Sequence, residues 1–129
     1  MQNRFRFRMY NNKTKVMIYD VETINDRFVS FSDNKDIILM QCSGLKDKNK
    51  KEIYEGDVIK LSGNDNPYMN KMMGIVKFSK KYAMFFIDIP NNFAWYDFVE
   101  IERKGIEVIG DIYTNPELVE KANANNSKI

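Results

Sequence analysis

Residues 53–61 read Ile-Tyr-Glu-Gly-Asp-Val-Ile-Lys-Leu, and the predicted architecture follows from this stretch more than from any other. Its β-branched and bulky residues favour a strand, in which successive side chains point to opposite faces. Val58 and Lys60 therefore face away from Asp57 and Ile59. Gly56 before Asp57 is typical of a bulge or a tight turn. We expect one strand here, and it opens a group of strands toward the C-terminus.

The residues that follow predict a small barrel. Apolar runs at 74–78 and 82–87 are separated by Ser79-Lys80-Lys81, which is the spacing of a hairpin with a short loop. Residues 62–69 are dense in Gly, Asn, Asp and Pro and predict a loop. The strands expected in this half are 53–61, 74–78, 82–87, 99–101 and 106–113. Short strands divided by turns indicate an SH3-like small barrel over about residues 52–113.

The N-terminal third predicts a second β portion, over about residues 1–45. From Arg4 to Met9 arginines alternate with apolar residues, and Asn11 and Asn12 then supply turn chemistry, so this segment and the next form a hairpin. The strands expected here are 4–9, 16–19, 24–31 and 37–42, the last bounded by Gly44. Residues 46–51 have no apolar member, and we expect a solvated turn that buries nothing.

One helix is expected, at about residues 116–122. Asn115 is a good N-cap, Pro116 suits the first helical position, and Glu117 places negative charge at the positive end of the helix dipole. Beyond Lys121 there are no packing residues, so the helix should fray. The predicted fold is one mainly β (α+β) domain over 1–129, in which the N-terminal sheet packs on the small barrel and the helix covers one opening.

Composition excludes several classes of protein. The 129 residues are 43% hydrophobic with a mean hydropathy of -0.51, which excludes disordered chains and integral membrane proteins. Histidine is absent and Cys42 is the single cysteine, so histidine-dependent catalysis, a disulfide within the chain and a thiolate metal cluster are excluded. The first residues alternate arginine with apolar residues, unlike a signal peptide or anchor. We expect a cytoplasmic protein without a cofactor, a metal or a membrane partner.

Three blocks of the sequence carry a family resemblance. They are Arg4-Phe5-Arg6-Phe7-Arg8, the central LMQCSGLKDKNKKEIYEGDV at 39–58, and EVIGDIYTNPEL at 107–118. Together they make nearly the whole chain similar to the YopX family of phage and prophage proteins. The resemblance implies a phage origin, a mainly β fold and no established activity. The single cysteine fits a reducing cytoplasm, which for a phage protein is that of the host cell. Cys42 stands where such sequences often carry an aromatic or other residue, so it is not a candidate active thiol.

The first candidate site is basic. Its members are Arg4, Arg6, Arg8, Lys13 and Lys15, and no acidic residue occurs before Asp20. Arginines on one strand face can contact phosphates, so this row is a candidate nucleic-acid interface. We favour the alternative, an exposed sheet face paired to carboxylates elsewhere, because a charged edge strand also deters aggregation.

The second candidate is a cluster of aromatic residues, and we take Phe93, Trp95 and Tyr96 as an interaction surface, with Phe98 close behind. Small barrels stack single-stranded bases on aromatic platforms beside basic residues. Aromatic residues at this density more often fill a core or an oligomer interface.

The third candidate is acidic and consists of Glu55, Asp57 and Asp111. Paired carboxylates can hold Mg²⁺ or act as acid and base. We favour a structural role, with Asp57 and Asp111 accepting hydrogen bonds from turn amides, because no further ligand accompanies them. No catalytic residue is assigned.

The function that we expect is that of a noncatalytic accessory protein, which binds another phage or host protein and self-associates through exposed strand edges. The first alternative is a nucleic-acid-binding module that uses the arginine strand. The second is a carboxylate-dependent enzyme, which requires Asp57 and Asp111 to converge in a pocket.

Overall fold

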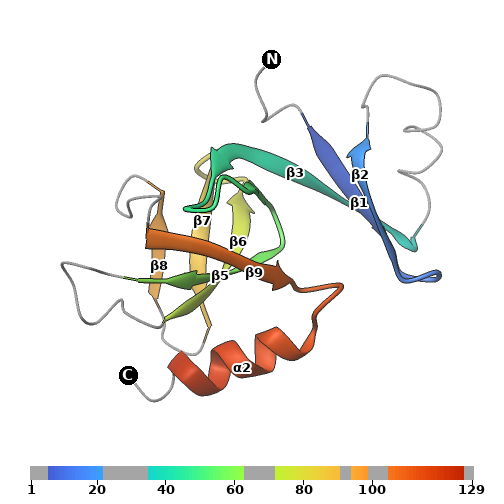
Figure 1. The fold of residues 1–129 in the computed structure, drawn as a ribbon. Helices are drawn as coiled ribbons and strands as arrows, with labels where there is room; N and C mark the ends of the chain where they lie inside the picture. Colours follow the sequence, from blue (N-terminus) through green and yellow to red (C-terminus); the bar gives the residue numbers. More distant parts are fainter. Residues whose placement is uncertain (1–5, 22–34, 63–71, 91–93, 99–104, 127–129) are drawn as a thin grey trace.

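The structure is a computed structural model that describes residues 6–21, 35–62, 72–90, 94–98 and 105–126. Its strands and helix are β1 (Phe7–Asn11), β2 (Val16–Val21), β3 (Ile37–Lys46), β4 (Glu52–Tyr54), β5 (Asp57–Leu61), β6 (Met73–Ser79), β7 (Met84–Ile89), β8 (Ala94–Asp97), β9 (Ile106–Asp111) and α2 (Glu117–Asn126). The chain is mostly β, as expected, with two antiparallel sheets and a C-terminal helix (Figure 1). The strands expected at 24–31 and 99–101 lie outside the described residues.

The N-terminal sheet has the strand order β2-β1-β3-β4. The predicted β1–β2 hairpin is present, and β1 also pairs with the first half of β3. We expected β3 to end before Gly44, but it continues through this glycine, which has a φ of +84°, to Lys46. The second half of β3 pairs with β4, and this strand therefore reaches from the hairpin to the other sheet (Figure 1).

The second sheet has the order β8-β7-β6-β5-β9 and curls into a half-barrel (Figure 1). The predicted hairpin is confirmed, because β6 pairs with β7 along its length. The main core lies on this sheet and also takes in Ile53 from β4. Its buried members are Ile53, Ile59, Leu61, Met72, Val76, Ile87, Ile89, Ile106 and Val108. Strand β9 ends at Asp111, two residues earlier than expected, since residues 112–114 form a turn.

The single strand expected at 53–61 is in fact two strands, β4 and β5, which belong to different sheets. Gly56 separates them and adopts a φ of +89°. Its backbone joins both neighbours of β5, because its N–H donates to Val76 O and its C=O accepts from Ile112 N. A left-handed residue at this point turns the chain from one sheet into the next, which alternation alone does not predict.

Gly56→Ala is expected to lower the free energy of unfolding by about 1–3 kcal/mol. An added Cβ would sit in a left-handed conformation, 2.9 Å from the Sδ of the buried Met40. Urea unfolding followed by fluorescence measures the change. Ala83→Gly is the matched control, because Ala83 has a φ of +53° in an exposed turn and should tolerate glycine. Equal stability of Gly56→Ala and the wild type would contradict the prediction.

The helix is longer than the sequence predicts. It runs from Glu117 to Asn126, and Ala122 is fully buried against Val58 and Met73. The expected fraying beyond Lys121 is therefore wrong, because a small alanine allows close packing of the helix on the sheet. Asn115 Oδ1 accepts a hydrogen bond from Asp111 N at 3.2 Å, so its side chain ties the helix entry back to β9. Across the described residues, no helix is long and apolar enough to span a membrane.

The turn at 46–51 is not fully solvated, contrary to expectation, because Asp47 is only 5% exposed. Its Oδ1 accepts hydrogen bonds from Asn49 N (2.8 Å) and Lys51 N (2.9 Å), and its Oδ2 accepts one from Val108 N at 2.8 Å. This carboxylate therefore fastens the turn to β9 of the half-barrel. A polar run can bury one member when that member satisfies backbone donors.

The N-terminal sheet has two unlike faces. Its inner face, which carries Arg8, Tyr10 and Met40, packs toward the half-barrel. There the rings of Tyr10 and Tyr113 stack at 5.4 Å, and Met40 lies beside Gly56. Alternation places Phe7, Met9 and Leu39 on the opposite side, which we call the outer face.

Candidate functional site

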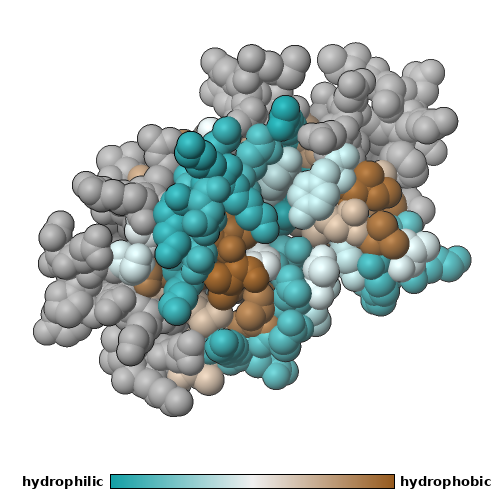
Figure 2. All heavy atoms as spheres, in the orientation of Figure 1, coloured by the Kyte–Doolittle hydropathy of each residue, from teal (hydrophilic) through white to brown (hydrophobic). Residues whose placement is uncertain are grey.

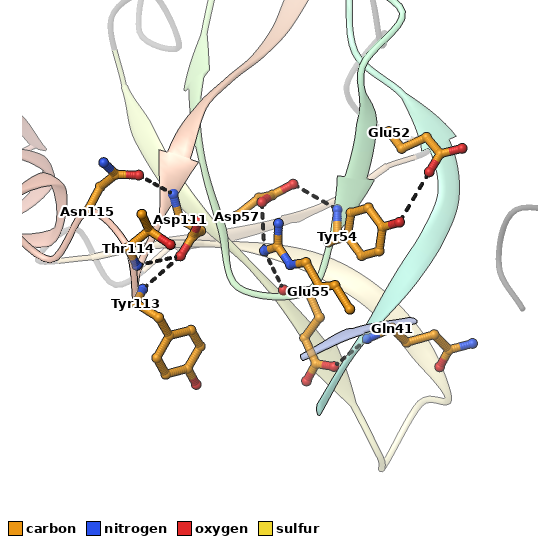
Figure 3. Close-up of polar contacts among 10 residues, drawn as sticks. Gln41, Glu52, Tyr54, Glu55, Asp57, Asp111, Tyr113, Thr114 and Asn115 are labelled. Atoms are coloured by element: carbon orange, nitrogen blue, oxygen red, sulfur yellow. Dashed lines mark hydrogen bonds and ion pairs between the residues drawn. The ribbon is translucent and has the colours of Figure 1, made fainter. Parts of the chain in front are cut away.

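A buried ion pair joins the two sheets. Arg8 on β1 donates to Asp57 Oδ1 on β5 at 2.8 Å, and both side chains are 2% exposed. The same guanidinium nitrogen donates to the carbonyl of Glu55 at 3.1 Å. Asp57 Oδ2 accepts from Tyr54 N at 2.8 Å, so both carboxylate oxygens are used (Figure 3). The pair holds the β4–β5 junction against β1.

Burial dominates the titration of Asp57. Desolvation raises its pKa from 3.8 to about 6, while the nearby Arg8 and the hydrogen bond from Tyr54 N act in the opposite direction. Burial also raises the pKa of the Cys42 thiol, which is fully enclosed, so Cys42 is not a reactive thiolate at neutral pH.

Two tyrosine rings pack on the Arg8 guanidinium. Its Cζ lies 4.7 Å from the centroid of the Tyr54 ring and 5.9 Å from that of Tyr19, and the two rings meet edge to face at 5.8 Å. Such contacts stabilise a desolvated cation. The guanidinium is not fully satisfied, however, because Arg8 Nε is buried and has no hydrogen-bond partner among the described residues.

A cavity of about 300 Å³ lies beside this arginine. We call it the Arg8 cavity, and it is lined by Arg6, Arg8, Tyr19, Lys51, Glu52 and Tyr54. Three cations and one carboxylate therefore form its charged walls. Glu52 binds Arg6 at 2.8 Å and accepts a hydrogen bond from the Tyr54 hydroxyl at 3.2 Å (Figure 3). Arg6 pairs with Glu52 and Arg8 pairs with Asp57, which leaves Lys51 as the lining cation outside these two ion pairs.

The predicted basic row does not form one exposed stripe. Arg6 is exposed and pairs with Glu52, and Lys13 and Lys15 lie in the exposed β1–β2 turn. Arg8 departs from the prediction, because it is buried against Asp57. Arg4 lies outside the described residues. The alternation places Arg8 on a strand, but it cannot show that a distant carboxylate pairs with this arginine.

Asp57 and Asp111 are cross-strand neighbours whose carboxylates bind different partners. They are directly opposite each other on β5 and β9, yet Asp111 Oδ1 accepts hydrogen bonds from Tyr113 N (3.0 Å) and Thr114 N (2.7 Å). Figure 3 shows the two carboxylates directed to different partners. Among the described residues, no three acidic or cysteine side chains are grouped to hold a metal ion.

Comparison with known proteins identifies the family of this chain. The family model described as YopX protein matches residues 3–120. The chain belongs to the YopX family. A search of the curated proteins found no match.

Solved structures are similar to this YopX-family chain in fold. Protein EF1440 from Enterococcus faecalis is 24% identical, with a TM-score of 0.63 over 88% of this chain and 96% of that one. Protein yopX from Bacillus subtilis is 23% identical, with a TM-score of 0.56 over 89% of this chain and 98% of that one. At these identities the likeness shows the fold alone.

The aromatic candidates of this YopX-family chain stay predictions. Phe93 lies outside the described residues, and of Trp95 and Tyr96 only the place in β8 is described. Phe98 is partly buried and packs against the main core.

Sequence reasoning missed Tyr19, Lys51 and Tyr54 as members of one site. They come from β2, from the turn before β4 and from β4, and no spacing links them. A second cavity, of about 260 Å³, lies on the β6–β7 hairpin and is lined by Ser79, Tyr82, Met84 and Phe86. None of these four lining residues is charged.

Proposed function

We propose that this YopX-family chain is a noncatalytic accessory protein that acts by protein binding and self-associates through its N-terminal sheet. One observation carries the proposal. The outer face exposes large apolar side chains, with Val16 49%, Ile18 43% and Leu39 36% accessible to solvent. Hydrophobic residues are visible over this end of the molecule in Figure 2. Exposed apolar side chains gathered on one face are typical of an interaction surface.

The strand register sets these exposed side chains in two rows. Ile18 and Leu39 flank Met9 from its two sides, and Val16 and Ile37 flank Asn11 in the next row. Residues directly opposite on neighbouring strands point to the same face. The two rows therefore cross three strands, with the buried Met9 and the polar Asn11 in their middles. They end at β2, which is an edge strand with β1 as its one neighbour among the described strands.

A second copy of the chain is the occupant that fits this edge. Two β2 strands can pair antiparallel about a two-fold axis, which satisfies the open backbone groups of both and joins their outer faces.

The alternatives have less support. Nucleic-acid binding through the basic row could not use Arg8, because this side chain is buried and paired with Asp57. An enzyme built on Asp57 and Asp111 would need both carboxylates in a pocket, whereas each serves partners within the fold. We retain the host-cell cytoplasm as the place of action in this proposal.

Ile18→Lys is expected to convert the wild-type dimer into a monomer. The wild type should show twice the chain mass of 15.3 kDa by light scattering after gel filtration, and the variant the mass of one chain. Ile18 lies near the middle of β2, so two-fold pairing of β2 with its copy brings the two introduced lysines close together, and their like charges oppose association. Because Ile18 is 43% exposed, the substitution should leave the fold intact.

Tyr82→Lys is the matched control, because Tyr82 is an exposed aromatic residue in the turn between β6 and β7, on the other sheet's hairpin. It should leave the dimer unchanged. A monomeric wild type at every concentration would contradict self-association. Loss of the dimer in Tyr82→Lys and its survival in Ile18→Lys would place the interface on the β6–β7 hairpin instead.

A further inference from the structure

The cavity on the β6–β7 hairpin faces away from the main core. It has a volume of about 260 Å³ and is lined by Ser79, Tyr82, Met84 and Phe86. Ser79 and Met84 are directly opposite each other in the strand register, and Phe86 follows Met84 on the same face of the sheet. Ile87, which alternates with them, is fully buried in the core. The cavity is therefore on the side of this sheet that the core leaves open.

Tyr82 gives this cavity an exposed aromatic wall. Its side chain is 59% accessible to solvent. The backbone N–H of Tyr82 donates to Ser79 Oγ at 3.2 Å, and Lys81 Nζ lies 5.2 Å from the centroid of the tyrosine ring. Because the backbone that carries the ring is already held, little order has to be gained when a planar group stacks on it.

The turn beside the cavity carries positive charge that the described residues do not neutralise. Lys77 pairs with Asp88 at 2.7 Å, which uses the one acidic residue of the two strands and their turn. Lys80 and Lys81 are exposed, and no described carboxylate lies within ion-pair distance of either. The contact with the Tyr82 ring places the Lys81 charge at the wall of the cavity. A ligand that combines a planar part with negative charge fits this surface.

We propose that the β6–β7 hairpin binds single-stranded nucleic acid, with one base in the cavity against Tyr82 and the flanking phosphates near Lys80 and Lys81. A single strand offers an unstacked base and a phosphate at every nucleotide, and aromatic rings beside cations bind such strands without reading their sequence. In a duplex both faces of a base are covered by its neighbours, so a duplex cannot use the ring.

This surface is distinct from the two surfaces discussed above. It lies on the second sheet, whereas the basic row and the outer face of the proposed dimer belong to the N-terminal sheet. Failure of nucleic-acid binding would therefore leave self-association untouched, and a monomeric chain could still bind the single strand. An acidic peptide shares the negative charge of the proposed ligand but lacks its planar base, so the exposed tyrosine ring favours the nucleic acid.

Fluorescence anisotropy of a labelled oligothymidylate, titrated with the full chain at low salt, tests the proposal. The single strand should bind, and the logarithm of its binding constant should fall against the logarithm of the salt concentration with a slope of about −1.4, since each of two phosphate contacts on a single strand contributes about 0.7. Absence of binding would overturn the proposal. A duplex of the same length that binds equally well would overturn the role of the base, and tighter binding of polyglutamate would assign the hairpin to acidic proteins instead.

Tyr82→Leu should weaken binding of the oligothymidylate about fivefold or more, because leucine keeps apolar bulk in the cavity but removes the stacking ring. Phe78→Leu is the matched control, because Phe78 is a 38% exposed ring of the same hairpin that does not line the cavity. It should leave the affinity unchanged. An equal loss of affinity in the two variants would overturn the placement of a base on Tyr82.

Lys80→Met combined with Lys81→Met should remove most of the salt dependence, because both phosphate contacts are lost. Lys13→Met combined with Lys15→Met is the matched control, since it removes the same charge from the exposed β1–β2 turn. The control should keep the wild-type slope, and both double variants should keep the wild-type melting temperature because all four lysines are exposed. A slope that is lost in the control and kept in the hairpin variant would place the phosphates on the N-terminal sheet and overturn the assignment.

Discussion

Arg8→Met is expected to lower the free energy of unfolding by about 3–5 kcal/mol at pH 7.5, because it leaves the Asp57 carboxylate buried without its cation. Arg8 Nη2 lies 2.8 Å from Asp57 Oδ1, and both side chains are only 2% exposed. Methionine keeps much of the length and volume of the arginine stem, so the loss reports on charge more than on packing. Urea unfolding followed by the tyrosine and tryptophan signal measures it.

The pH dependence of this loss has a defined sign. In the wild type the pKa of Asp57 is raised from 3.8 to about 6, so its contribution to stability is complete below pH 4 and is lost as the pH rises through 6. Arg8 opposes the rise, and its removal moves the pKa higher still. The variant therefore keeps losing stability above pH 6, where the wild type has levelled off. The stability gap should widen from pH 5.5 to about pH 8.

Two further variants separate charge from packing. Arg8→Met combined with Asp57→Asn should recover part of the stability and abolish the pH dependence of the gap, because no buried charge remains. Arg6→Met breaks the 2.8 Å pair with Glu52, in which Arg6 is 45% exposed, and should cost about 1 kcal/mol or less. If Arg8→Met were no more harmful than Arg6→Met, the buried pair would not have the structural role assigned to it.

Asp47→Ala is the other substitution with a large expected effect, a loss of about 3 kcal/mol, since three backbone donors lose their acceptor. The largest part of the loss should come from the Val108 N–H, because it is buried and donates to Asp47 Oδ2 at 2.8 Å. The donors of Asn49 and Lys51 lie in an exposed turn, where water can replace the carboxylate. Urea unfolding gives the total change, and hydrogen exchange at Val108 N–H shows where the protection is lost.

Asp88→Ala is the matched control for Asp47→Ala. Asp88 accepts from Lys77 Nζ at 2.7 Å in a pair that is 50% and 32% exposed, so its loss should change stability by about 1 kcal/mol or less. The loss of stability in Asp47→Asn should lie between those of Asp47→Ala and Asp88→Ala, because a carboxamide keeps one acceptor oxygen. Unchanged exchange at Val108 in Asp47→Ala would contradict the clamp.

Local patterns predicted the hairpins well. The alternation before Asn11 and the apolar run after Lys15 predict β1 and β2, and the runs on either side of Lys80 predict β6 and β7. In each hairpin, the residues that specify the turn and the strands lie close together in the chain. The mainly β fold class and the YopX-family relationship could likewise be predicted from the residues, and both are confirmed.

The candidate site was less predictable. Arg8 was identified as a basic strand residue and Asp57 as a turn carboxylate, but nothing local indicates that they form one pair. The hydrogen bond from Arg8 to Glu55 spans 47 positions of the chain, and the one from Val108 to Asp47 spans 61. The burial of Ala122 could not be predicted from neighbouring residues either, because it depends on the sheet beneath the helix.

Periodicity and turn residues were thus sufficient for the strands of the hairpins, because a side chain's face and a glycine's freedom are properties of neighbouring residues. The division of residues 53–61 at Gly56 into two sheets, the burial of Arg8 and the gathering of Tyr19, Lys51 and Tyr54 around one cavity were settled only when the sheets packed together. Burial and pairing of charge depend on which distant segments exclude water from a side chain, and that information is absent from any short stretch of chain.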